Sequence, residues 1–342
     1  MVSLRKLLKI SILPLFWASA LSPQPVLAAG GEGGASEVSE VIMHHVTDDH
    51  VWHFADGLVL PLPVIVYSDS TGLAVFSSGN FFNADHAPAP YQHSNGVTYQ
   101  LEHGHVSVVG STHHLLDLSI TKNVAMLFIN VALIMFVFTR VAAGYKRNRG
   151  KAPSGIQSFL EPVILFVKDE VIRPNVGPRY EKYLPYLLTL FFFILFGNLL
   201  GLLPGAANLT GNIAVTATLA FFTFLITNFS GNKAYWSHIF WTPGVPLPLR
   251  VIILPVEIIG IFTKPFSLMV RLFAAITAGH IVMLSLLSLT FIFHSWGAGV
   301  GASIFVIVIN LIELLVAGIQ AYVFTLFTSL YIGLAIEEHD HH

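Results

Sequence analysis

The sequence contains no cysteine, few charged residues and almost no net charge. Without cysteine, the chain has neither a disulfide framework nor a thiolate metal site. Charged residues make up 11% of the 342 residues and the formal net charge is −2, so nucleic acid is not an expected partner. Apolar residues are abundant instead, with 54% hydrophobic residues and 27 Phe. This composition is typical of a polytopic membrane protein with a polar part attached.

The first 29 residues have the pattern of a secretory signal peptide. Arg5, Lys6 and Lys9 precede an apolar run at residues 10–21, and small residues around Ala28 suit cleavage. Three prolines in this stretch disfavour an uncleaved spanning helix. We therefore predict a mature chain that begins in the periplasm of a bacterial cell.

Residues 30–121 differ from the rest of the chain, because they hold ten of its sixteen His and many small polar residues. Runs rich in strand-forming residues occupy positions 58–67, 73–77 and 97–101, and turn sequences separate them. The pattern predicts a small β-rich extracytoplasmic N-terminal domain.

Two close histidine pairs in this region, His50 with His53 and His103 with His105, have a spacing that a transition metal can use. Imidazoles without a defined ligand set indicate solvated surface residues more strongly than a metal site. We therefore predict no metal site and no cofactor. The same interpretation covers His44, His45, His113 and His114.

From residue 122 to residue 342 the chain becomes a membrane domain with apolar spans long enough to cross a bilayer. A basic cluster from Lys146 to Lys151 follows the first span and belongs on the cytoplasmic side, so an odd number of spans leaves the C-terminus cytoplasmic as well. The fold class is therefore an all-α polytopic membrane protein. Its five transmembrane helices are expected at about 124–143, 184–203, 213–229, 258–293 and 302–336.

Three connecting segments complete the topology. Residues 157–171 carry apolar residues at helical spacing with charges after them, which predicts an amphipathic helix on the cytoplasmic surface. The polar residues 230–250 are expected to form a cytoplasmic loop, and residues 294–301 a tight outer turn. The two spans joined by that turn would each be about 50 Å long against a hydrocarbon core of about 30 Å, so they must tilt strongly or bend.

Ionisable residues lie deep in these last two spans. Arg271 and His280 occupy the fourth span and Glu313 the fifth. A charged side chain at the bilayer centre costs about 3 kcal/mol or more and needs a partner, a polar pocket or a nearby anion. The three residues therefore predict a buried charge-transfer site rather than a purely structural helix pair.

Helical phase separates the polar residues into two groups. Arg271 and His280 are nine positions apart, which places them on opposite faces of one helix and about 13 Å apart along its axis. They are expected to face different partners. In the last helix a narrow stripe of polar or small residues faces one way, formed by Asn310, Glu313, Ala317 and Gln320.

The motifs in residues 122–339 resemble subunit a of the F-type ATP synthase, the stator beside the rotating c-ring. The resemblance rests on the run Ser267–Phe273 around Arg271, on Ala278-Gly279-His280, and on motifs elsewhere. Those others are Glu257 upstream, Asn198 with Leu202–Gly205, and the ending with Glu313, Gln320, Tyr331 and Ile336–His339.

This resemblance implies proton translocation through two offset half-channels. It implies that Arg271 attracts the deprotonated rotor carboxylate, that His280 and Glu313 relay protons in the outer half-channel, and that Gln320 lies close to Arg271. Weaker channel candidates are Glu257, Ser267, Asn198 and Asn310. The implied partners are the c-ring, the peripheral-stalk b subunits, the catalytic head reached through the stalk, and the lipid bilayer. The chain itself is then not an enzyme.

The sequence departs from the family pattern at several positions. Ala275 stands where relatives often carry Asn, and Gly201 where they often carry an acidic residue. The order His280 then Glu313 exchanges the common acidic residue and histidine, which keeps one imidazole and one carboxylate for relay. The signal peptide and the His-rich region are not general features of the family.

The alternative function is a secondary ion or metal transporter whose His-rich domain collects the ion. Such a protein is expected to contain inverted repeats with broken helices around a midplane site. The spans show no such repeat. A receptor or structural membrane protein would give no reason for deep charges at Arg271 and Glu313.

Overall fold

The computed structural model describes most of the chain from residue 47 to residue 337 and groups it into two compact units. The first unit holds the chain up to Phe128, Leu200–Asn208 and His280–Leu311, and the second holds Ile129–Leu199, Leu209–Gly279 and the chain from Ile312. The structure describes residues 47–55, 58–68, 72–82, 89–94, 96–102, 104–110, 115–148, 150–203, 205–241, 246–293 and 296–337. The signal peptide predicted at residues 1–29 lies outside these ranges.

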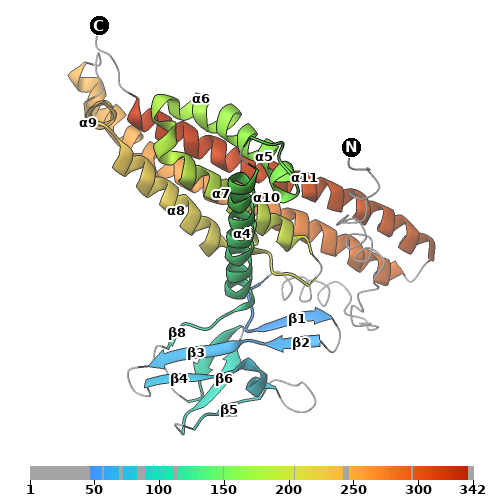
Figure 1. Ribbon diagram of the computed structural model, residues 1–342. Coiled ribbons are helices and arrows are strands. Elements are labelled where there is room, and N and C mark those ends of the chain that lie inside the picture. The colour runs from blue at the N-terminus through green and yellow to red at the C-terminus, as the bar shows by residue number, and fades with distance from the viewer. Residues whose placement is uncertain are drawn as a thin grey trace. The chain divides into compact units, whose positions relative to one another are not determined.

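Short antiparallel strands form the N-terminal part of the first unit, as the sequence predicted (Figure 1). β1 (Val51–Ala55) pairs with β2 (Leu58–Pro61), and β3 (Pro63–Ser68) lies between β4 (Gly72–Ser77) and β8 (Leu116–Asp117). The short 3-10 turn η2 (Ser78–Phe81) follows β4. The third sheet contains β5 (Tyr91–Gln92), β6 (Thr98–Glu102) and β7 (His105–Val108).

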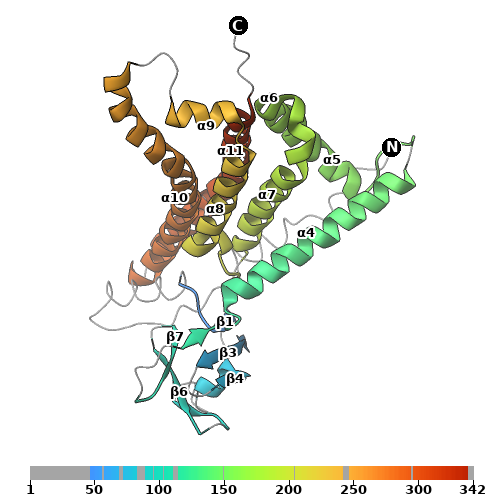
Figure 2. The same ribbon diagram turned by 90° about the vertical axis from the view of Figure 1, so that its left-hand side faces the viewer.

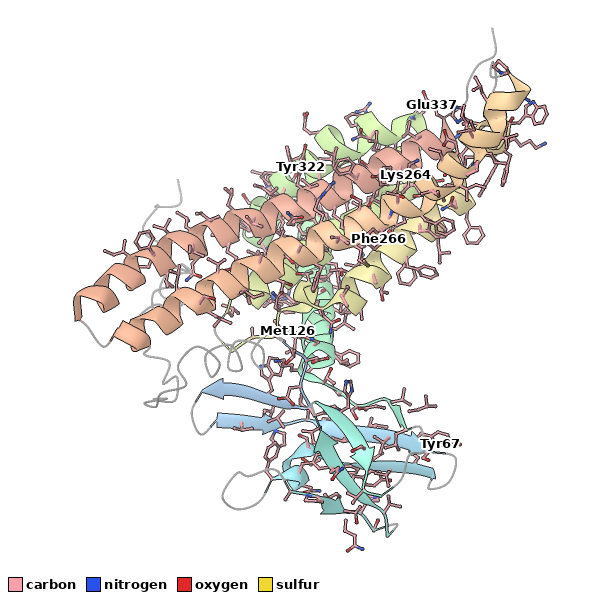
Figure 3. All side chains as sticks on the ribbon, turned by 180° about the vertical axis from the view of Figure 1, so that it is seen from behind. Tyr67, Met126, Lys264, Phe266, Tyr322 and Glu337 are labelled. Carbon is pink, nitrogen blue, oxygen red and sulfur yellow. The ribbon has the colours of Figure 1, made fainter. Side chains whose placement is uncertain are left out.

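Alternating burial along β3 and β4 creates one apolar face. Val64 and Val66 of β3 are buried together with Phe76 of β4, and they form a core with Phe81 and Tyr99. Residues at the intervening positions point the other way, as Tyr67 does in Figure 3. This period of two is what half-buried strands require. Residues 58–67, expected as one strand, are divided at Leu62 into β2 and β3.

One ion pair ties the two ends of this β-rich region together. His50, only 2% exposed, donates from Nε2 to Oδ2 of Asp117 at 3.1 Å. Partial burial raises the pKa of the Asp117 carboxyl, but hydrogen bonds from His50 and Ser119 and the charge of His50 outweigh this. The resulting pKa is about 2, against 3.8 for an isolated side chain.

We expect Asp117→Asn to destabilise this region near neutral pH by roughly 1 kcal/mol, after allowance for the partial exposure of the pair. Because the folded pKa lies below the unfolded value, the ionised carboxylate stabilises the fold above about pH 4. That contribution disappears as the pH falls from about 4 to about 2. Hydrogen exchange of β3 amides in the intact protein is the measurement. Equal protection in the variant and the parent protein at pH 7 would contradict the assignment.

Helices make up the described chain from Lys122 onward. The longer ones are α4 (Lys122–Arg147), α5 (Ile156–Phe166), α7 (Tyr180–Gly201), α8 (Ile213–Ser230), α9 (Lys233–Phe240), α10 (Leu247–Phe293) and α11 (Trp296–Ile336). Between them lie the π-helical turn η3 (Val167–Ile172), α6 (Arg173–Val176), and the 3-10 turns η4 (Gly177–Arg179) and η5 (Leu209–Gly211). Among the residues that the structure describes, five helical segments are long and apolar enough to cross a membrane, which confirms the all-α polytopic fold class.

The second of these segments, Ile156–Gly201, contains two helical parts. The first part continues from α5 through the π-helical turn η3 to α6 and includes the stretch predicted to be a separate amphipathic helix. Gly177, with φ of 73°, ends α6, and the 3-10 turn η4 leads into α7. The helix predicted at residues 157–171 is thus separate from α7 and continues to Val176. In η3, Nζ of Lys168 lies 3.4 Å from Oδ1 of Asp169.

Two other boundaries correct the predictions. α10 begins at Leu247 rather than at residue 258, and the expected loop 230–250 contains α9, which the Asn232 side chain caps by accepting from the Tyr235 amide. The first turns of α11 occupy Trp296–Gly301, most of the expected outer turn. Helix continues through Pro255 and through the glycines after Trp296 because, in apolar surroundings, the helix supplies hydrogen-bond partners that lipid cannot.

Within the second unit, α7 and α8 lie side by side with the C-terminal half of α11 (Figure 2). Their shared core includes Leu187 and Phe192 of α7, Leu272 of α10 and Phe324 of α11. A methyl group on Gly333 would collide with the Asn175 carbonyl, so the backbones of α11 and α6 approach closely there. Small residues at contacts are what membrane helices use, since lipid provides little hydrophobic drive for association.

Candidate functional site

Arg271 lies on α10 with its guanidinium over an aromatic ring of α11. Its Cζ is 4.5 Å from the centroid of Phe327, and Leu268 and Leu272, each 1% exposed, flank it on α10. Among the described residues, no hydrogen-bond acceptor meets the buried Nη1 atom. The ring face stabilises the cation, by about 1 to 2 kcal/mol for a desolvated pair. Guanidinium donors thus remain available for an anion brought from outside the chain.

Gln320, the residue expected near Arg271, is half-buried on α11. No hydrogen bond joins it to Arg271 in the described part of the chain. Phe327, which Arg271 does contact, lies seven positions farther along α11. Seven residues are two helical turns, so Gln320 and Phe327 share one face of α11. Arg271 therefore lies against the expected face of α11, but closer to the C-terminal end of that helix than Gln320.

Glu313 is 3% exposed on α11, and it lies against α10 at Gly279. A methyl group placed on Gly279 would be 3.2 Å from Glu313 Oε1 and 3.3 Å from its Cδ. Any larger residue at position 279 would therefore have to displace the carboxyl group. The pairing places a titratable carboxyl group deep between two membrane helices, where such groups mark functional sites by default.

His280 follows Gly279 on α10, and its ring contacts the end of α7. The Nε2 atom lies 3.2 Å from the carbonyl oxygen of Gly201. Because a carbonyl oxygen only accepts, this hydrogen bond requires hydrogen on Nε2. The neutral ring is then the tautomer with its hydrogen on Nε2 and its lone pair on Nδ1.

The polar stripe of α11 is held by α7. Asn198, 2% exposed, donates from Nδ2 to the carbonyl of Ala317 at 3.2 Å. Its Oδ1 accepts from Thr210 Oγ1 at 2.6 Å. Both ends of the amide are thus used for packing and orientation, and Asn198 fixes the helix turn that follows Glu313. Asn310, the first residue of the stripe, is half-buried.

The two remaining candidates lie on the N-terminal half of α10. Ser267 is exposed and Glu257 is half-buried. Burial raises the pKa of the Tyr235 hydroxyl on α9, and the negative charge of Glu257 raises it further. Glu257 is therefore near enough to α9 to act on it electrostatically, while its expected place in a proton channel stays a prediction.

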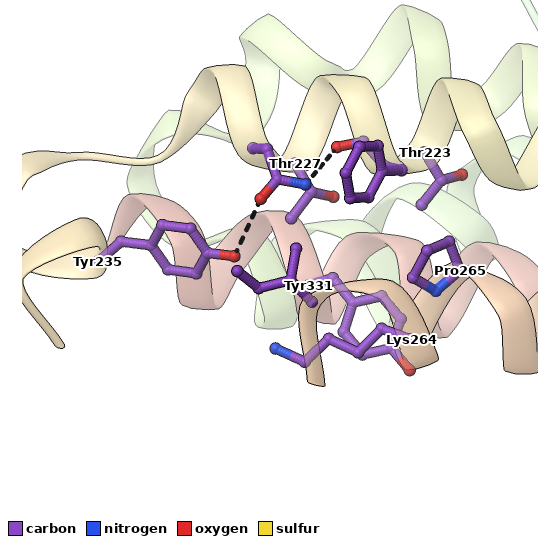
Figure 4. A pocket seen from close by; sticks show the side chains of 9 residues that line it. Thr223, Thr227, Tyr235, Lys264, Pro265 and Tyr331 are labelled. Carbon is purple, nitrogen blue, oxygen red and sulfur yellow. Dashed lines mark hydrogen bonds between the residues drawn. The ribbon is translucent and has the colours of Figure 1, made fainter. Parts of the chain in front are cut away.

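A small pocket, partly open to its surroundings, lies between α8, α9, α10 and α11 (Figure 4). Tyr235 donates from its hydroxyl to Asn228 Oδ1 at 3.4 Å, and Asn228 donates to the Phe224 carbonyl at 2.8 Å. Lys264 enters the pocket with its Nζ 5.6 Å from the ring centroid of Tyr331. The pocket combines apolar walls with convergent polar groups, as binding and water-holding cavities do.

Sequence reasoning missed a row of buried hydroxyl groups beside this pocket. Tyr186 Oη lies 3.1 Å from Thr223 Oγ1, which lies 3.4 Å from Thr328 Oγ1. Both threonines are no more than 1% exposed. A signal was present, because Thr216, Thr223 and Thr227 recur at helical spacing along α8. Threonine is common in membrane helices, so spacing alone did not distinguish them.

The histidines of the β-rich region that the structure describes do not share a site. His50 is bonded to Asp117 and His105 is exposed. The described residues contain no group of three or more side chains suited to hold a metal ion. The histidines at positions 44, 45, 103, 113 and 114 lie outside the described residues, as does the side chain of His53.

Two family models match the chain. Residues 124–333 match the family described as ATP synthase A chain, and residues 41–125 match a family described as a domain of unknown function. The first match covers more than half of the sequence and includes the candidate residues from Asn198 to Gln320.

Curated relatives share the same description. ATP synthase subunit a 2 of Chlorobaculum tepidum is 47% identical over 245 residues, which are 70% of this chain and 68% of the relative. ATP synthase subunit a 2 of Prosthecochloris aestuarii is 39% identical over 338 residues, 96% of this chain and 90% of the relative. ATP synthase subunit a of Chlorobium phaeobacteroides strain DSM 266 is 40% identical over 315 residues, covering 90% and 78%. The similarity thus extends through the β-rich region as well as the helices.

Proposed function

The chain belongs to the F-type ATP synthase subunit a family, and from this premise we propose that it is the stator subunit that supplies two proton half-channels to a c-ring. It is a multi-pass subunit of the inner membrane and takes part in proton transport for ATP synthesis. The observation that carries the proposal is Arg271, a permanent cation between membrane helices with an uncommitted Nη1 among the described residues. The alternative of a secondary metal transporter is not favoured, because the family match covers all five spans.

Arg271 would act on the rotor by charge. A guanidinium stays protonated at any accessible pH. In a low-dielectric surrounding it attracts an approaching carboxylate and favours its ionised form. A rotor carboxyl group that reaches Arg271 would therefore release its proton and pass as an anion. The same fixed charge repels protons, which prevents direct leakage between the two half-channels.

Glu313 and His280 would relay protons in the outer half-channel. Glu313 lies beside Gly279, and His280 is the next residue of α10. In this step His280 keeps its Nε2 hydrogen on the Gly201 carbonyl while Nδ1 takes a proton and passes it on. An imidazole and a carboxylate suit the task because each holds or releases a proton near neutral pH.

The remaining candidates would serve the inner half-channel and its surroundings. Glu257 is assigned to the cytoplasmic exit, Gln320 would lie close to Arg271, and Ser267 and Asn310 are weaker candidates for the channel lining. Asn198 acts by orienting α11 through the Ala317 carbonyl. The mature N-terminus would lie outside and the C-terminus in the cytoplasm, with the c-ring, the b subunits and the catalytic head as partners. The chain would need no cofactor and would not itself catalyse a reaction.

The proposal predicts that the tagged chain copurifies with the c-ring and the ATPase head, and that the purified complex in vesicles pumps protons when given ATP. Removal of this chain from the complex should abolish pumping while ATP hydrolysis by the head continues, because the ion path and not the chemistry is lost. Ion uptake by the chain alone, without rotor subunits, would favour a transporter and overturn the proposal.

A further inference from the structure

The β-rich region makes a short, partly buried hydrogen bond to the loop that follows α7. Trp52 of β1 is 5% exposed, and its indole Nε1 donates to the carbonyl oxygen of Gly205 at 2.6 Å. The indole also packs in a small core with Leu62, Met126 and Ala207 (Figure 3 labels Met126). Strand, first helix and loop are therefore joined at one point, all within the first unit.

The loop is held at its other end by Gly201. A methyl group on Gly201 would be 3.4 Å from the Asn208 Cα and from its Oδ1, so the returning loop lies directly on this glycine. Gly205 has φ of 75°, a conformation that side chains rarely allow, and it turns the chain back. The described parts of this loop, residues 201–203 and 205–208, are thus close together where Asn208 meets Gly201.

The Gly201 carbonyl is the group that receives the hydrogen bond of His280, with 3.2 Å between its oxygen and Nε2. A path therefore runs from the Trp52 indole through the Gly205 carbonyl and residues 205–208 to Gly201, whose carbonyl meets the imidazole. A movement of the turn changes the acceptor that fixes the ring orientation and tautomer. Such support of a functional imidazole by the group that its other nitrogen meets is a common requirement for precise proton transfer.

We infer that Trp52 is a positioning residue for His280, and that the β-rich region holds residues 205–208 against Gly201 so that the ring faces the outer proton path. The inference rests on the proposed relay role of His280. It assigns a task to a region whose matching family is described only as a domain of unknown function. Packing of the indole fills space, but only the N–H group fixes the Gly205 carbonyl.

The test replaces Trp52 by Phe, which keeps an aromatic ring and removes the donor. Proton flux driven by a membrane potential is measured in vesicles that carry the whole complex, with the pH varied on each side separately. We expect half-maximal flux to require about three- to tenfold more protons on the outer side, the factor that corresponds to one buried hydrogen bond. The dependence on inner pH should stay unchanged, because Trp52 acts only on the outer side.

Two further variants separate the possible outcomes. Trp241→Phe is the matched control, because Trp241 is an indole 59% exposed and far along the chain, and its flux should equal that of the parent protein. Leu62→Ala loosens the same small core without removing the N–H donor. It should lower the amount of assembled complex and change the dependence of flux on outer pH less than Trp52→Phe does. Flux is expressed per assembled complex. A lower yield of folded complex therefore does not change the outer proton concentration that gives half-maximal flux.

If the dependence of flux on outer pH is unchanged in Trp52→Phe while flux is impaired in His280→Ala, this inference is overturned and the relay role of His280 is retained. Full flux in His280→Ala removes the relay role itself, and the inference fails with it. A shift on the inner side equal to that on the outer side would show a general structural defect and would also overturn the positioning role.

Discussion

Arg271→Ala is expected to lower proton-driven ATP synthesis by about a hundredfold or more and to permit a passive proton leak. The guanidinium is the fixed charge that would make a passing rotor carboxylate give up its proton. Alanine leaves that carboxyl group protonated at the Phe327 surface and opens a route between the half-channels. ATP synthesis and proton flux in vesicles with the mutant complex are the measurements. Near-normal coupled synthesis from this variant would refute the role of Arg271.

Lysine at position 271 is expected to restore little of the lost synthesis. The planar guanidinium lies over the Phe327 ring at 4.5 Å, an arrangement that uses its flat shape as well as its charge. An ammonium group is a strongly hydrated point charge on a flexible stem and loses its proton more readily when buried. Arg271→Lys should therefore bind the rotor carboxylate in a wrong position or in a wrong protonation state.

Arg250→Ala is the matched control for these two variants. Arg250 also lies on α10 over an aromatic ring, with its Cζ 4.1 Å from the centroid of Trp241, and its buried Nε has no hydrogen-bond partner in the described part of the chain. It is not a candidate for contact with the rotor carboxylate. Coupled synthesis per assembled complex should therefore remain near the parent level, which distinguishes loss of a special charge from loss of any buried arginine.

The spans and the deep charges could be predicted from the sequence because each depends on local properties. Apolar length fixed the existence of the five helical segments, and the cost of a charge in lipid pointed to Arg271 and Glu313. The strands near residues 64 and 74 followed from alternation and turn residues. Their approximate positions are confirmed by β3 and β4. The roles of the site residues remain proposals.

The details that the sequence did not reveal depend on contacts between distant segments. Proline at position 255 and the glycines after Trp296 usually end helices, yet helix continues because its backbone groups have few other partners in apolar surroundings. The bond between Trp52 and Gly205 joins residues 153 positions apart, and no periodicity encodes it. Helical phase indicated the polar face of α11, but only the folded chain shows that Gly279 makes room for Glu313.

Glu313→Gln is expected to slow proton conduction by about ten- to a hundredfold while the complex still assembles. The amide keeps the volume of the carboxyl group beside Gly279 but neither takes up nor releases a proton at working pH. If Glu313 and His280 act on one path, the combination with His280→Ala should cost less than the product of the two single losses. Losses that multiply fully would show that the residues serve separate sites.

Gly279→Ala tests the same site through geometry, without removing a titratable group. The added methyl group would lie 3.2 Å from Glu313 Oε1, tighter than most real contacts, so the carboxyl group must shift by a few tenths of an ångström. We expect conduction to fall severalfold, because proton transfer depends steeply on donor–acceptor placement. Gly318→Ala is the control, since a methyl group there meets nothing within 4 Å and the helix itself favours alanine. Proton flux per complex in vesicles is compared for the two variants, and equal flux would mean that the position of the Glu313 carboxyl group does not limit conduction.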